Sequence, residues 1–109
     1  MASSVDGIAG TILGEAAQTG GNIWNKTRNG SQVYIKGYAQ SLVDIAGAVA
    51  AGDMSEEEGK AAAQSASFFF QMMVANASQV TLFEVQTFLN KVIGTVKDTV
   101  NAALPVPIL

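Results

Sequence analysis

The chain of 109 residues contains no cysteine and no histidine, and these two absences remove much familiar enzyme chemistry. Without cysteine there is no disulfide framework and no thiolate metal ligand. Without histidine the commonest general base is missing, which excludes serine hydrolase triads and histidine-bound zinc. The sequence therefore predicts a protein that is not an enzyme and that needs no cofactor.

Charge is also scarce, because Asp, Glu, Lys and Arg make up 14% of the chain against about 25% in an average soluble domain. The six Lys and Arg residues are scattered and form no stripe that would follow a phosphate backbone. We therefore expect no nucleic-acid partner. A weakly charged surface favours association, so the expected partners are other copies of this chain or other helical proteins.

Four of the nine acidic residues gather between positions 53 and 58, which raises the question of a calcium site. Three residues match the first, third and fifth places of an EF-hand loop: Asp53, Ser55 and Glu57. The match then fails, because Glu58 stands where glycine is needed and Gln64 where the bidentate glutamate belongs. No metal site is predicted, and the cluster is assigned to the positive end of a helix dipole.

The longest uncharged stretch lies between Lys60 and Glu84 and covers 23 residues. It is long enough for a membrane span of about 20 residues, but polar residues such as Gln71 and Asn76 interrupt it. The N-terminal residues lack the basic region of a secretory signal. We predict neither a cleavable signal nor a transmembrane helix, and contact with a membrane stays open as an alternative.

Apolar residues recur at spacings of three and four, which is typical of amphipathic helices. Glycine and capping residues mark the breaks, with Gly52 before the Ser55 and Glu58 pair, and Thr81 before Glu84. Asp53 with Glu56 has the same capping-box spacing. Within a single domain over 1–109, these patterns predict helices at about 4–19, 32–51, 54–78 and 82–104, followed by an extended tail over 105–109.

Residues 22–36 allow two structures. Asn29-Gly30 between Ile23-Trp24 and Val33-Tyr34-Ile35 is a strong signal for a short β-hairpin. Lys26 and Arg28 interrupt the alternation, and the neighbouring segments favour helix. The segment is therefore predicted as helix or loop, with the hairpin as the alternative.

The predicted fold class is all-α, as a small antiparallel bundle of three to four helices joined by short connections. The second arrangement is a long helical hairpin over 32–104, with an N-terminal arm that packs on a neighbouring copy. In both, the two ends of the chain, 1–21 and 105–109, are expected to be mobile.

The predicted third helix is apolar over most of its circumference, which is unusual. Phe69 and Phe70 are expected to share its main buried face, while Phe68 and Met72 point elsewhere. Asn76, together with Ser65, is expected near the centre of the apolar face, where an unpaired amide would cost about 1–3 kcal/mol. A hydrogen bond to another helix is therefore predicted there.

Candidate interaction residues follow from this reading: Phe68, Met72, Gly10, Gly14, Ile108 and Leu109. Gly10 and Gly14 have a spacing that lets helices approach closely, and the last two belong to a tail that could dock on a partner. Trp24, Tyr34 and Tyr38 lack the convergent polar groups of a pocket, so no small-molecule site is predicted.

The function that these features favour is that of a self-associating structural protein, such as the subunit of a filament, a virion or a similar assembly. One alternative is a membrane-active protein that inserts its uncharged central helix. Another is a small adaptor or inhibitor that binds one protein partner through the acidic turn or the tail.

Overall fold

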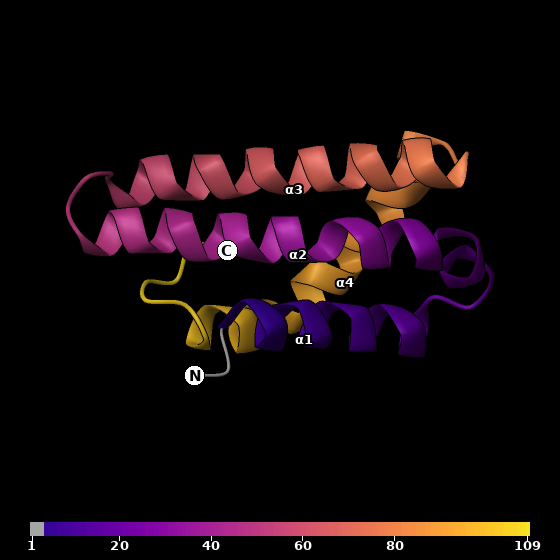
Figure 1. The fold of residues 1–109 in the computed structure, drawn as a ribbon, viewed down its shortest axis with the longest axis horizontal. Coiled ribbons are helices and arrows are strands. Elements are labelled where there is room, and N and C mark those ends of the chain that lie inside the picture. The colour runs from indigo at the N-terminus through magenta and orange to yellow at the C-terminus, as the bar shows by residue number, and fades with distance from the viewer. Residues whose placement is uncertain (1–3) are drawn as a thin grey trace.

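A computed structural model describes residues 4–109, and over these residues the chain is entirely helical, with no strand (Figure 1). The first three residues of the expected N-terminal arm lie outside the described range. The prediction of a small helical bundle is confirmed. The helices are α1 (Ser4–Thr19), α2 (Asn22–Ala50), α3 (Glu56–Ser78) and α4 (Leu82–Ala102).

The helices pack in a closed ring in which each contacts the next, and α4 returns to α1. α2 and α3 lie side by side and antiparallel and make the largest interface. α1 lies on the other side of α2, and α4 runs behind α2 from the end of α3 to α1 (Figure 1). No contact joins α1 to α3. The molecule measures 41 × 26 × 20 Å along its principal axes.

The N-terminal helix belongs to this bundle rather than to a free arm. Its apolar stripe is buried against α2 and α4 and consists of Ile8, Ala9, Ile12 and Ala16. On the surface, Lys36 of α2 pairs with Asp6 at 3.6 Å. The long hairpin with an arm on a neighbouring copy is therefore not the arrangement seen, because α1 buries its apolar stripe within its own chain.

The alternative of a β-hairpin at Asn29-Gly30 is wrong, because both residues lie inside the continuous helix α2. Gly30 is buried against α3: a Cβ built on it would lie 3.0 Å from Ser78 Oγ and 3.3 Å from Ala77 Cβ. Gly30 therefore permits the close approach of α2 and α3. The Asn-Gly pair alone does not show whether its glycine serves a turn or a helix contact.

The connections follow the predicted capping residues. Ser55 begins α3 with a complete capping box, in which Glu58 N donates to Ser55 Oγ at 3.1 Å and Ser55 N donates to Glu58 Oε1 at 2.9 Å. Thr81 Oγ1 accepts from Glu84 N at 3.2 Å at the start of α4. Gly52 adopts a left-handed φ of 82° in the turn between α2 and α3.

The buried side of α3 differs from the predicted one. Phe70 is buried, whereas Phe69 is 57% exposed, and Asn76 and Ser65 are exposed as well. The difference arises because α3 contacts both α2 and α4, so its buried side is set by two neighbours rather than by the apolar stripe. The hydrogen bond between helices comes instead from the buried Gln71, whose Nε2 donates to Asn90 Oδ1 of α4 at 2.7 Å.

The C-terminal tail packs on the bundle, although it was expected to be mobile. It turns back from the end of α4 toward α2 (Figure 1), and it buries Leu104 and Ile108 in the core. Asn101 holds its last residue: Nδ2 donates to Leu109 O at 3.3 Å, and Leu109 N donates to Oδ1 at 3.0 Å. Two buried aliphatic side chains and these bonds account for the ordered path.

Candidate interaction groove and adjoining cavity

The predicted interaction residues do not come together on one surface. Phe68 is 46% exposed and Met72 half-buried, both on α3. Gly10 and Gly14 lie on α1, which does not contact α3. The two groups of residues therefore lie on separate helices. Their roles in association stay predictions.

Gly10 and Gly14 face away from the rest of the chain. A Cβ added to either would meet no atom within 4 Å. Their close-approach spacing is therefore not used by any helix of the described bundle.

The two predicted tail residues occupy different environments. Ile108 lies in the core, where its Cγ2 is 3.5 Å from the position of a Cβ on Gly59. Leu109 is half-buried and lines a cavity beside α3 and α4. In the folded chain the tail therefore contributes packing at Ile108 and a cavity wall at Leu109.

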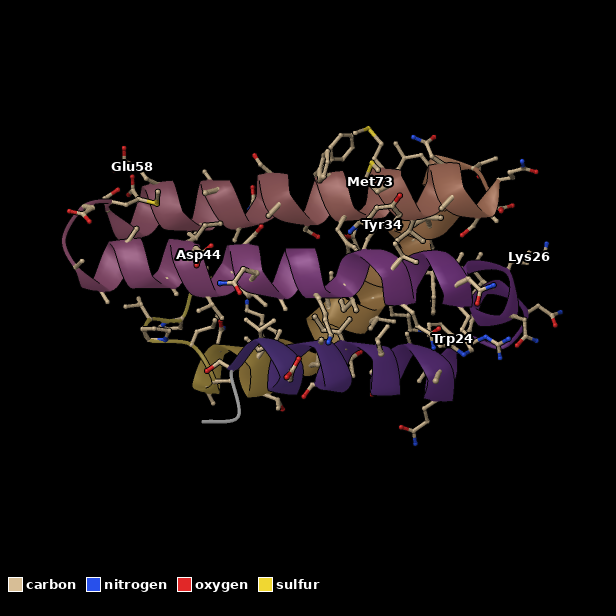
Figure 2. All side chains as sticks on the ribbon, in the orientation of Figure 1. Trp24, Lys26, Tyr34, Asp44, Glu58 and Met73 are labelled. Atoms are coloured by element: carbon tan, nitrogen blue, oxygen red, sulfur yellow. The ribbon has the colours of Figure 1, made fainter. Side chains whose placement is uncertain are left out.

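A shallow groove of about 320 Å³ runs between α2 and α3 and contains no charged side chain. Val33 of α2 and Phe69 of α3 flank it and are 69% and 57% exposed. Figure 2 shows Tyr34 and Met73, two further lining residues, on these neighbouring helices. The remaining lining residues are Gly37, Tyr38, Ser41, Ala66 and Phe70.

Two stacked aromatic rings form the inner wall of this groove. The rings of Tyr38 and Phe70 lie 5.1 Å apart between centroids, with an interplanar angle of 3°, and both side chains are buried. Their stacking joins α2 to α3. The sequence pattern places Val33 in the alternative hairpin and Phe69 on the buried face of the third helix, so neither is expected beside a surface groove.

A second hollow of about 430 Å³ lies on the other side of Tyr38, where α3, α4 and the tail meet. Its polar lining consists of Lys60, Gln64, Ser67, Asn90 and Lys97. Its other lining residues, besides Tyr38, are Ala63, Ile93, Gly94, Ile108 and Leu109. Two cationic and no acidic side chains line it, so the hollow is positively charged in a protein whose net charge is −3.

The Tyr38 hydroxyl is a buried polar group between these two features. The residue is 3% exposed, and its hydroxyl has no hydrogen-bond partner of acceptable geometry. Burial raises the pKa of Tyr38 to about 12, and the neighbouring Ser67 hydroxyl offsets a small part of that rise. The phenol therefore stays protonated at neutral pH and can act as a hydrogen-bond donor.

Two further searches of residues 4–109 bear on the alternatives. No group of three or more acidic side chains is gathered there that could hold a metal ion. In the same part of the chain, no helix combines the length and the apolar character needed to cross a membrane.

Comparisons with protein-family models, with curated proteins and with solved structures gave no match.

Proposed function

We propose that this chain is a non-enzymatic structural protein that self-associates through the groove between α2 and α3. The observation that carries the proposal is an uncharged groove flanked by two strongly exposed apolar side chains, Val33 and Phe69. Burial of a valine or phenylalanine side chain is worth about 1.5–3 kcal/mol. Contiguous exposed apolar surface of this kind marks interaction sites on helical proteins.

The occupant that fits is a second copy of the same chain. Phe69 and Val33 supply projections, and the small side chains of Gly37, Ser41 and Ala66 supply the hollow between them. An interface about a two-fold axis requires a projection and a matching hollow on the same surface. Because the groove has no charge of its own, two copies can meet there without opposing like charges.

The test is the molar mass measured by light scattering over a concentration series. The wild-type chain is expected to form a discrete or growing oligomer, and Phe69→Lys is expected to shift it to monomer because a lysine would be buried without a partner. Phe83→Lys is the matched control, since Phe83 is 77% exposed at the start of α4 and does not line the groove.

Circular dichroism of both variants controls for folding. A wild-type chain that stays monomeric at every concentration contradicts the proposal. Dissociation by Phe83→Lys and not by Phe69→Lys also contradicts the assignment of the interface to the α2/α3 groove.

A further inference from the structure

The hollow between α3, α4 and the tail shares one lining residue, Tyr38, with the groove of the proposed interface. Its lining divides into two parts. Lys60 and Lys97 bring positive charge, while the half-buried Ile93 and Leu109 bring aliphatic surface. Sites for small molecules combine a mostly apolar lining with a few placed polar groups, in volumes of roughly 300–1,000 Å³. The hollow has this character, at about 430 Å³.

The hydrogen bonds that Gln71 donates use acceptor oxygens of the polar lining and leave mainly donors available in the hollow. Gln71 Nε2 donates to Asn90 Oδ1 at 2.7 Å and to Ser67 Oγ at 3.0 Å. These bonds occupy acceptor positions on two lining residues and leave the Asn90 amide hydrogens and the Ser67 hydroxyl hydrogen for another partner. Two lysine ammonium groups add donors that cannot accept. A ligand that accepts hydrogen bonds is therefore favoured.

The Tyr38 hydroxyl supplies a second, independent observation. It belongs to a side chain that lines the hollow and is 3% exposed. It makes no hydrogen bond of acceptable geometry, although the Ser67 hydroxyl lies beside it. Its neighbour Ser67 lines this hollow and not the α2/α3 groove, so the hydroxyl end lies on the side of the hollow. An unpaired buried hydroxyl is destabilising, and an accepting ligand would satisfy it.

We propose that this hollow binds a small amphipathic carboxylate, with its anionic end at Lys60, Lys97 and the Tyr38 hydroxyl and its hydrocarbon chain against Ile93 and Leu109. A carboxylate accepts several hydrogen bonds and pairs with lysine. The aliphatic wall formed by α4 and the tail provides the surface for the chain. A fully polar anion would leave that wall in water, and a neutral chain would leave the lysines and Tyr38 unused.

The binding experiment uses the full chain and sodium decanoate below its micelle-forming concentration, followed by amide NMR shifts. Saturable shifts are expected at Ile93 and Gly94. Decanol and decyltrimethylammonium are the matched neutral and cationic probes, and each is expected to bind about tenfold more weakly or not at all. Equal binding of decanol would overturn the assignment of the anionic end.

Three variants locate the site. Lys97→Glu is expected to weaken decanoate binding about tenfold or more, because it replaces an attractive charge by a repulsive one. Lys91→Glu, on the same helix but outside the hollow, is expected to leave it unchanged. Tyr38→Phe keeps the ring stack with Phe70 and removes only the hydroxyl, so about tenfold weaker binding is expected from an otherwise folded chain.

Gly94→Leu tests the hollow without depending on charge. A Cβ at Gly94 meets no atom within 4 Å, so the variant is expected to fold and to fill the hollow, and decanoate binding should be lost. Binding that survives Gly94→Leu, or that Lys91→Glu weakens as much as Lys97→Glu does, overturns the proposal. If Phe69→Lys abolishes decanoate binding and the variants in the hollow do not, decanoate binds in the α2/α3 groove, which also overturns the proposal.

Discussion

The interface between α2 and α3 and the outer face of α1 are both built with glycine, yet they use it in opposite ways. At the interface, a Cβ on Gly59 would lie 2.6 Å from Val49 Cγ2, and one on Gly30 would lie 3.0 Å from Ser78 Oγ. On α1, a Cβ on Gly10 or Gly14 would meet nothing within 4 Å. Spacing between small residues therefore permits close packing but does not decide whether a partner helix is present.

Adjacent aromatic residues on α3 show the same contrast between an inner and an outer side. Phe70 is buried against the Tyr38 ring, and Phe69 is 57% exposed beside the groove. One residue of offset along a helix is a rotation of about 100°, which here separates the core from the proposed association surface. Variants at paired inner and outer positions test whether the two sides contribute differently to stability.

The largest difference is expected between Phe70→Ala and Phe69→Ala. Phe70→Ala removes a buried ring and its stacking on Tyr38, so the free energy of unfolding should fall by about 3–5 kcal/mol. Phe69→Ala should change the free energy of unfolding of the monomer by less than about 1 kcal/mol. Urea unfolding at a concentration where both variants are monomeric measures the two values. Equal losses would show that both sides of α3 are packed.

Alkaline pH should distinguish the inner tyrosine from the outer one. The pKa of Tyr38 is raised from 10.0 to about 12 in the folded chain, so the unfolded chain loses its proton first. The free energy of unfolding should therefore fall between pH 10 and about 12, by at most about 1.4 kcal/mol per pH unit. Tyr38→Phe should remove this part of the decline.

The control for this experiment is Tyr34→Phe, which changes the half-buried tyrosine of the same helix. It should keep the wild-type alkaline slope in urea unfolding. The difference between the slopes of Tyr38→Phe and the wild type isolates the contribution of Tyr38. A Tyr38→Phe variant with the wild-type slope would contradict the buried, protonated hydroxyl.

The two kinds of glycine should respond to alanine with opposite signs. Gly59→Ala should lower the free energy of unfolding by about 1–3 kcal/mol, because its Cβ overlaps the β-branched Val49. Gly10→Ala should raise it by about 0.5–1 kcal/mol, because alanine is the better helix former and has open space there. Thermal unfolding of the two variants provides the measurement. Stabilisation by both would show that α2 and α3 are not closely packed at Gly59.

The smallest effect is expected at the exposed cap of α3. Hydrogen bonds from the Ser55 backbone N–H, and then from its side chain, lower the pKa of Glu58 below its ordinary 4.5. The unfolded chain therefore takes up the proton first as pH falls. The cap contributes above pH 4.5 and is lost as pH drops through the lowered folded value.

Glu58→Gln should flatten this acid dependence of the melting temperature, and Glu57→Gln in the same first turn is the control. Scans of thermal unfolding from pH 7 to pH 3 compare the two with the wild type. An identical acid response in the wild type and in Glu58→Gln would argue against the charged capping box.

The capping residues of α3 and α4 were predictable because capping is local, whereas α2 begins at Asn22 and not near residue 32. Ser55 and Glu58 satisfy each other across one turn, as do the Thr81 hydroxyl and the Glu84 amide, and no distant residue is needed. The all-helical class followed from apolar spacing in the same way. Residues 22–36 were the exception, because Gly30 is explained only by Ser78 and Ala77 of another helix.

The candidate sites were mostly not predictable, since each is formed by residues far apart in the sequence. Phe69 becomes a surface residue only because α2 and α4 together select the buried side of α3. The positively charged hollow combines Tyr38 of α2 with Lys60 of α3 and Lys97 of α4. No spacing along the chain brings those three residues together.

Amphipathic helices and the caps of α3 and α4 follow from the sequence because they depend on neighbours within one or two helical turns. The absence of histidine and cysteine chemistry follows from the residue inventory. Only the tertiary structure decided which glycines are packed, which phenylalanine is exposed, that the tail covers the core, and where a polar hydroxyl is left without a partner. These properties depend on which helix faces lie against each other, and that choice is made by the combined burial of apolar surface over the whole bundle.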